Sequence, residues 1–154
     1  MVKCLKENSM SVLSEIINIA IIKEHEAAKF YTSMQSRQPS VKVQHVLKSF
    51  IDMENAHQRA LEEYLSSGNF KSIHTAPDVT NLLHDLKTGS KSGETQDLRD
   101  MFDLAIREEE SAHTLYKTLS VTFKNETGAA SLFSRLADEE LSHRNTLTAL
   151  RNNL

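Results

Sequence analysis

Apolar residues recur every three or four positions through four stretches of the chain. This spacing is typical of amphipathic helices that bury one face. Pro39 ends the first stretch, because its ring disfavours helix in the residue before it, and Gly68 ends the second as a left-handed cap. The predicted helices cover, in chain order, residues 11–38, 40–67, 95–125 and 129–152.

The lengths of the connections predict how these helices are arranged. Only a few residues separate the first helix from the second and the third from the fourth, so each pair is expected to form an antiparallel hairpin. The intervening residues 68–93 are rich in Ser, Thr, Gly and Asn, which indicates a crossover containing a short helix from Pro77 through Leu86. Neither hairpin could bury its own seam, so residues 1–154 are expected to form one all-α domain. A four-helix bundle with one long crossover between helices two and three has the ferritin-like topology.

Each predicted helix has a glutamate near the middle of its apolar seam, and two of these glutamates have a histidine three residues later. Residues i and i+3 share a helix face, so each Glu-x-x-His pair presents an oxygen and a nitrogen on one side. Packing of the four seams is therefore expected to bring six side chains to one level inside the bundle. The six residues are Glu24, Glu54, His57, Glu109, Glu140 and His143.

Carboxylates inside an apolar core must be protonated, paired or bound to cations, because an unpaired buried charge is costly. No Lys or Arg lies on the four seams, whereas two divalent cations would balance the four carboxylates with both histidines neutral. The ligand set matches that of di-iron and di-manganese carboxylate bundles. Mixed oxygen and imidazole ligands favour iron or manganese over copper. We therefore expect two iron ions, with manganese as the alternative and zinc as a substitute.

The two halves of the sequence repeat this pattern. Residues 20–31 match residues 105–116, and residues 54–61 match residues 140–147. Two hairpins related by a two-fold axis would build two similar half-sites, one for each ion. Tyr31 and Tyr116 lie two turns beyond the single glutamates, where each is expected to pack in the core with its hydroxyl bonded to a ligand carboxylate.

The remaining histidines and the glutamates beside the expected ligands fall off the seams. Glu110-x-x-His113 has the spacing of the paired motifs, but it is expected to be solvated. Surface positions are also expected for the following residues: His25, His45, His74, His84, Glu26, Glu108 and Glu139.

Charge and composition exclude several classes of protein. A net charge of −3 provides no basic surplus to displace counterions from nucleic acid. The most apolar stretch, residues 12–22, contains Glu15 and Asn18 and is too short to cross a bilayer. The N-terminus lacks the apolar region of a signal peptide, and the one cysteine, Cys4, can form no internal disulfide. These features predict a cytoplasmic protein that binds neither nucleic acid nor membrane.

From about residue 11 to residue 152 the chain resembles the rubrerythrin branch of the ferritin-like superfamily. The resemblance rests on Glu24-x-x-Ala27-x-x-Phe30-Tyr31, Glu54-x-x-His57, Glu109-x-x-Ala112-x-x-x-Tyr116 and Glu140-x-x-His143. It implies a non-haem di-iron centre that reacts with peroxide or dioxygen, and a homodimer. By the same resemblance, Glu24 and Glu109 are single-helix carboxylate ligands. Glu54 and Glu140 belong to the paired motifs, in which His57 and His143 each bind one ion.

Two departures from the family's pattern affect the expected activity. Rubrerythrins carry a rubredoxin-type iron site with four cysteines, whereas this chain has one cysteine, so its electrons would come from an external donor. Rubrerythrins also have an extra glutamate where this chain has Ala112, and that glutamate takes part in redox-dependent iron movement. The leading hypothesis is an oxidoreductase that reduces peroxide or dioxygen. The alternatives are iron sequestration with slow ferroxidase activity and a structural or regulatory bundle that the metal stabilises.

Overall fold

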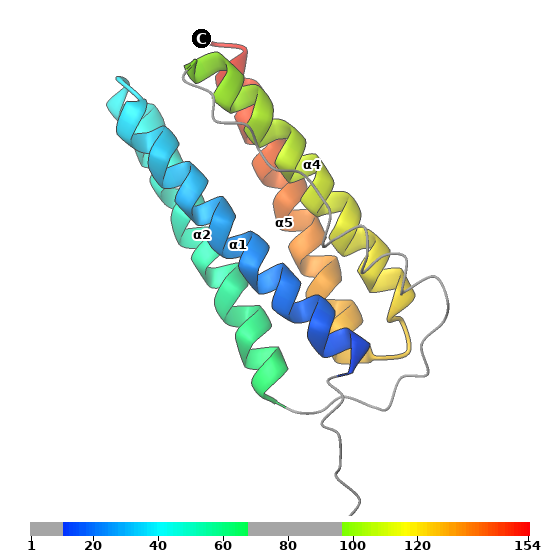
Figure 1. The fold of residues 1–154 in the computed structure, drawn as a ribbon. Helices are drawn as coiled ribbons and strands as arrows, with labels where there is room; N and C mark the ends of the chain where they lie inside the picture. Colours follow the sequence, from blue (N-terminus) through cyan, green and yellow to red (C-terminus); the bar gives the residue numbers. More distant parts are fainter. Residues whose placement is uncertain (1–10, 68–96) are drawn as a thin grey trace, which may run out of the picture.

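A computed structural model describes residues 11–67 and 97–154. These residues form four long helices: α1 (Val12–Arg37), α2 (Val41–Ser66), α4 (Leu98–Thr122) and α5 (Thr127–Arg151) (Figure 1). The predicted all-α four-helix bundle is confirmed. The predicted short helix at residues 77–86 and the predicted cap at Gly68 lie outside the described residues.

Side-chain caps explain where three of the helices begin. The hydroxyls of Ser11 and Ser40 accept hydrogen bonds from the backbone N–H groups three residues later, and the Asp97 carboxylate accepts one from Arg99. Such caps satisfy N–H groups that the first turn of a helix leaves without partners. Because Asp97 is the cap, α4 begins at Leu98, three residues later than predicted.

Helix α5 begins slightly earlier than the sequence pattern indicates. Its first residue is Thr127, so Gly128 lies inside the first turn instead of before the helix. A Cβ atom on Gly128 would lie 2.9 Å from the Cε2 atom of Tyr64. The glycine therefore allows the Tyr64 ring of α2 to pack closely against the start of α5.

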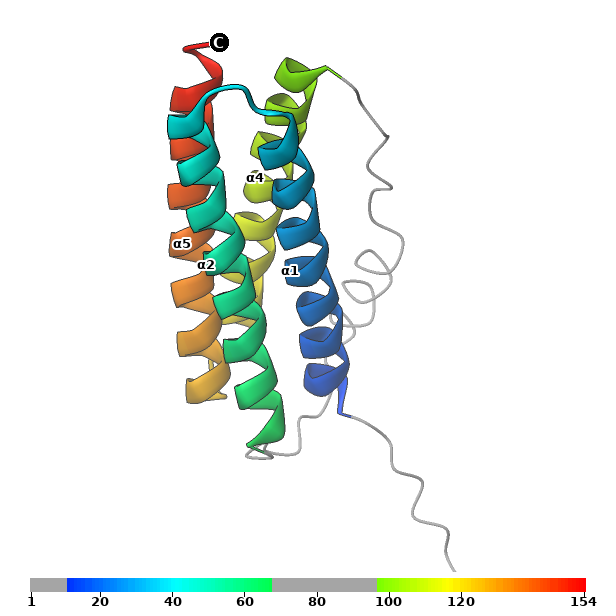
Figure 2. The same ribbon diagram turned by 90° about the vertical axis from the view of Figure 1, so that its left-hand side faces the viewer.

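The helices form two antiparallel hairpins, α1 with α2 and α4 with α5 (Figures 1 and 2). The helices pack closely within each hairpin and less closely between hairpins, where α1 faces α4 and α2 faces α5. In Figure 2, α2 ends at the lower end of the bundle and α4 begins at the upper end. The end of α2 and the start of α4 therefore lie at opposite ends of the bundle, as the predicted crossover requires.

A layer of polar side chains divides the core into two apolar clusters. One cluster packs around Leu61, Leu119 and Phe133, and the other packs around Met34, Leu47 and Phe102. Between them lie four glutamates and two histidines that are all at least 95% buried. The two clusters hold the helices in register and thereby fix the level at which these polar side chains meet.

The face between α1 and α4 is hollowed. A groove of about 1040 Å³ runs along it and reaches the buried glutamates. Residues of α1 and α4 with apolar side chains provide much of its lining: Ile19, Ala27, Phe30, Leu104, Ala112 and Leu115. Within the described residues, no helix is long and apolar enough to cross a membrane.

Candidate metal centre

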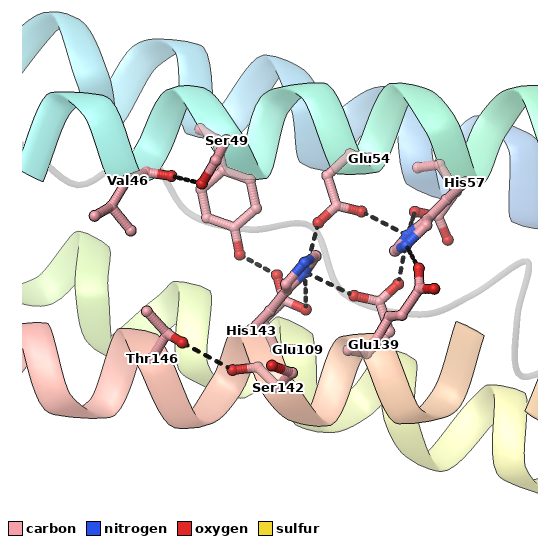
Figure 3. A network of polar contacts seen from close by, with 12 residues as sticks. Val46, Ser49, Glu54, His57, Glu109, Glu139, Ser142, His143 and Thr146 are labelled. Atoms are coloured by element: carbon pink, nitrogen blue, oxygen red, sulfur yellow. Dashed lines mark hydrogen bonds and ion pairs between the residues drawn. The ribbon is translucent and has the colours of Figure 1, made fainter. Parts of the chain in front are cut away.

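The structure brings together all six residues that the sequence indicates as ligands. Each helix contributes its mid-seam glutamate, and α2 and α5 also contribute a histidine one turn later. Figure 3 shows Glu54 and His57 on α2 directed toward His143 across the bundle. The predicted convergence on one buried level is therefore found in the fold.

The six side chains form two overlapping groups of four. One group contains Glu24, Glu54, His57 and Glu140, and the other contains Glu54, Glu109, Glu140 and His143. Within each group, one ligand atom from every residue lies within 4.8 Å of the others. Glu54 and Glu140 belong to both groups, so their carboxylates are placed to bridge two ions. Glu24 and Glu109 each belong to one group and are placed as terminal ligands.

In both histidines the Nδ1 atom faces the carboxylates. The Nδ1 atom of His57 lies 3.3 Å from Glu24, 3.2 Å from Glu54 and 3.1 Å from Glu140. The Nδ1 atom of His143 lies 3.0 Å from Glu54, 3.6 Å from Glu109 and 3.2 Å from Glu140. The two half-sites thus repeat the same arrangement, as the sequence repeat predicts.

Several of these buried atoms make no hydrogen bond to the described residues. They are Glu54 Oε1, Glu109 Oε2, Glu140 Oε1 and both ring nitrogens of His143. The His143 Nδ1 atom is close to three carboxylates, but these contacts lack hydrogen-bond geometry. Buried polar atoms without partners are rare in native proteins and call for an explanation such as an ion. Oxygen and imidazole donors are also the ligands that iron and manganese accept, so the residues fit a two-ion centre.

The four carboxyl groups divide into two pairs by pKa. Burial raises the pKa of Glu24 from 4.5 to about 8, against the effect of His57, and burial raises the pKa of Glu109 well above its ordinary value. Burial acts in the same direction on Glu54 and Glu140, but their contacts with His143 and His57 lower the pKa of both below the ordinary value. In the metal-free protein the bridging carboxyl groups therefore ionise more readily than the terminal ones.

Both histidines hold a proton strongly in the metal-free protein. Burial lowers the pKa of His143, but contacts with Glu109, Glu140 and Glu54 outweigh it and raise the pKa from 6.5 to about 12. The pKa of His57 is raised for the same reason, chiefly by Glu140 and Glu24. The protonated form of both imidazoles is therefore favoured when no metal is bound.

Two tyrosines bond to the terminal carboxylates across the bundle. The Tyr31 hydroxyl of α1 donates to Glu109 of α4, and the Tyr116 hydroxyl of α4 donates to Glu24 of α1. Burial is the largest cause that raises the pKa of both tyrosines well above 10, and the neighbouring glutamates act in the same direction. The predicted bond between each buried tyrosine and a ligand carboxylate is confirmed, and it crosses from one hairpin to the other.

Glu139 was expected to be a solvated surface residue, and this prediction is wrong. Its side chain is 38% exposed, yet its Oε2 atom lies 2.6 Å from the Nε2 atom of the buried His57 (Figure 3). Glu139 lies on α5, one residue before Glu140, at a position that faces α2 of the other hairpin. The seam pattern missed this contact because it assigns residues to one helix face without placing the partner helix.

The other off-seam residues join neither ligand group. Glu110 is exposed and paired with Arg144, as expected, whereas His113 is partly buried and donates from Nδ1 to the Ala137 carbonyl at 2.8 Å. His113 was therefore wrongly interpreted as solvated. The remaining predictions in the described chain are correct, since the following residues are exposed: His25, His45, Glu26 and Glu108. His74, His84 and Cys4 lie outside the described residues.

Comparisons with known proteins agree with this fold and site. A family model described as Rubrerythrin matches residues 9–83 and 100–154. A solved structure of a hypothetical protein from Pyrococcus furiosus aligns with a TM-score of 0.69 and 22% sequence identity, covering 96% of this chain and 92% of that chain. At this identity the likeness shows the fold alone. Curated proteins give no significant match.

Proposed function

The chain belongs to the rubrerythrin family, and on that premise we propose that it binds two iron ions and reduces peroxide or dioxygen with electrons from an external donor. The observation that carries the proposal is the pair of overlapping four-residue groups that share Glu54 and Glu140. A single ion would need only one of these groups. Two groups with shared carboxylates provide places for two neighbouring ions.

The donor set has the charge and the atoms that two such ions need. Glu24 and His57 would hold one ion from the α1–α2 hairpin, and Glu109 and His143 would hold the other from the α4–α5 hairpin. Two ferrous ions bound there would together supply two electrons, the number that, with two protons, reduces hydrogen peroxide to two water molecules. Glu54 and Glu140 belong to both groups and would help to hold both ions.

The surrounding side chains position the ligands. Tyr31 and Tyr116 hold the terminal carboxylates in place through hydrogen bonds that join the two hairpins. Apolar clusters close the site above and below along the bundle axis. The ligand side chains are at least 95% buried, and electrostatic interactions between buried groups are stronger than in water.

The groove between α1 and α4 provides a route for a small oxidant. Its lining includes Glu24, Glu54, Glu109 and Glu140, so it connects the surface of the bundle with the ligands. Ala27 and Ala112 lie along it, one turn after Glu24 and Glu109. Both are small, and they leave the terminal ligands accessible from this side. The extra glutamate of rubrerythrins would occupy the position of Ala112.

The first test is elemental analysis after anaerobic loading with ferrous iron, for which we expect about two irons per chain. The second is the rate at which peroxide oxidises the loaded protein, followed by absorbance. Glu54→Ala should abolish this oxidation, because Glu54 belongs to both groups. Glu62→Ala removes an exposed carboxylate from the same helix and should leave the rate unchanged. Unchanged oxidation in Glu54→Ala, or no bound metal in the unmodified protein, would contradict the proposal.

A further inference from the structure

The outer nitrogens of the two site histidines have different surroundings. The Nε2 atom of His57 lies 2.6 Å from the Glu139 carboxylate. The Nε2 atom of His143 is buried and has no hydrogen-bond partner among the described residues. The inner Nδ1 atoms, by contrast, face equivalent sets of carboxylates. The two half-sites therefore have matching ligand residues, but they differ in the surroundings of the outer Nε2 atom of the histidine.

The sequence repeat shows where this difference arises. Asp138-Glu139-Glu140-x-x-His143 on α5 corresponds to Asp52-Met53-Glu54-x-x-His57 on α2. Glu139 of α5 contacts His57 of α2, and the residue of α2 that corresponds to Glu139 in the repeat is Met53. A thioether is at most a weak acceptor, whereas a carboxylate is a strong one. One substitution within the repeat thus removes the partner of His143.

The aromatic packing around the two histidine rings also differs. The Phe50 ring stacks on the His143 ring with their centroids 4.7 Å apart. The residue that corresponds to Phe50 in the repeat is Leu136, which has no ring to stack on His57. His143 therefore lies in the more apolar environment of the two histidines.

We propose that Glu139 makes the two metal positions unequal, so that the ion on the His57 side binds first and more tightly. This inference rests on the proposed two-ion centre. A histidine that binds an ion through Nδ1 carries its proton on Nε2. Glu139 accepts that Nε2–H, fixes the ring orientation and makes Nδ1 a stronger donor. Among the described residues, none accepts a hydrogen bond from the Nε2 atom of His143. Loss of such an outer partner typically lowers metal affinity about 10–100-fold, which sets the expected difference between the two sites.

Two variants compare the sites directly. Metal-free His143→Ala keeps the His57 side, and His57→Ala keeps the His143 side. Each is titrated with Co²⁺ alone in competition with a chelator, and circular dichroism checks that the bundle is folded. His143→Ala should bind its remaining ion about 10–100-fold more tightly than His57→Ala does. Equal affinities, or the reverse order, would overturn the inference.

A second set of variants tests Glu139 itself in a protein that keeps all six ligands. Glu139→Ala should weaken the first of the two Co²⁺-binding steps about 10–100-fold and leave the second unchanged. Glu139→Gln keeps an acceptor oxygen at the same position and should restore part of the loss. Met53→Glu supplies the missing carboxylate and should strengthen the second step. A Glu139→Ala protein with both steps unchanged would overturn the inference.

The control is Asp138→Ala, which removes an exposed negative charge one residue away on the same helix. It should leave both steps unchanged, because Asp138 contacts neither histidine in the described structure. If Asp138→Ala weakens the first step as much as Glu139→Ala, the effect is one of overall charge and the inference is wrong. Failure of the unmodified protein to bind Co²⁺ would instead contradict the two-ion centre. Two equal sites would contradict this inference alone.

Discussion

Tyr31 of α1 donates its hydroxyl hydrogen to Glu109 of α4, and this bond joins the two hairpins through a residue of the metal centre. Both side chains are buried, at 2% and 4% exposure. The α1–α4 face is the one that the groove opens. The bond therefore links the two helices on the side where packing between the hairpins is weakest.

Tyr31→Phe should destabilise the metal-free protein by about 1–3 kcal/mol, because it leaves a buried Glu109 oxygen without its donor. Urea unfolding followed by circular dichroism measures this loss. Tyr116→Phe should cost a similar amount through Glu24, since the two bonds are related by the repeat. Thr118→Ala removes an exposed hydroxyl that bonds within its own helix, and its effect should stay within about 0.5 kcal/mol. If Tyr31→Phe and the unmodified protein have equal free energies of unfolding, this bond does not stabilise the fold.

Metal binding should release protons at neutral pH, from the carboxyl groups of Glu24 and Glu109 and from the two imidazolium groups, because the pKa values of all four are raised. The physical reason is that ligands bind ions only after deprotonation, and the raised pKa values keep these four groups protonated without metal. Metal affinity should therefore rise steeply between pH 6 and pH 8. Calorimetric titrations with Co²⁺ in buffers of different ionisation enthalpy count the protons. Release of none would show that the metal-free site is charged differently.

The metal-free protein should become less stable as the pH rises from 5 to 8. The folded-state pKa of Glu24 is about 8, against 4.5 in the unfolded chain, so the folded state binds more protons in this range. Above pH 6.5 the unfolded histidines also lose protons that His57 and His143 retain when folded. Both effects lower the free energy of unfolding as the pH rises. Melting temperatures measured across this range test the prediction, and a rise toward pH 8 would contradict it.

Ala112→Phe should slow the oxidation of the iron-loaded protein by peroxides, because the ring would fill the groove beside Glu109. The loss should be several-fold for hydrogen peroxide and larger for tert-butyl hydroperoxide, which needs more space. Ala149→Phe adds the same ring at an exposed position of α5 and serves as the control. Stopped-flow absorbance measures both rates. If neither peroxide is slowed, the oxidant reaches the ions by another route.

Iron loading of Ala112→Phe is measured in the same samples. The variant keeps all six ligands, so it should still hold about two irons per chain. A loss of iron would mean that the ring has disturbed Glu109, and the rate could then not be assigned to the groove.

The sequence by itself determined the four helices, their pairing into hairpins and the level of the site. Helical periodicity is local, and a charged side chain on a buried seam is unfavourable enough to be recognised without a structure. For this reason the six residues from Glu24 to His143 were identified from their spacing alone. The repeat between the two halves also predicted two similar half-sites.

Only the tertiary structure decided which carboxylates belong to both ligand groups and whether a residue hydrogen-bonds to the outer nitrogen of each histidine. The sequence does not show which glutamates are shared, whereas the distances between helices place Glu54 in both groups and Glu24 in one. Glu139 is adjacent to a ligand in the sequence, yet it contacts His57 on the other hairpin, 82 residues away. Such contacts depend on how far apart the helices pack and how each is rotated about its axis. These quantities are set by the whole core and not by any single helix.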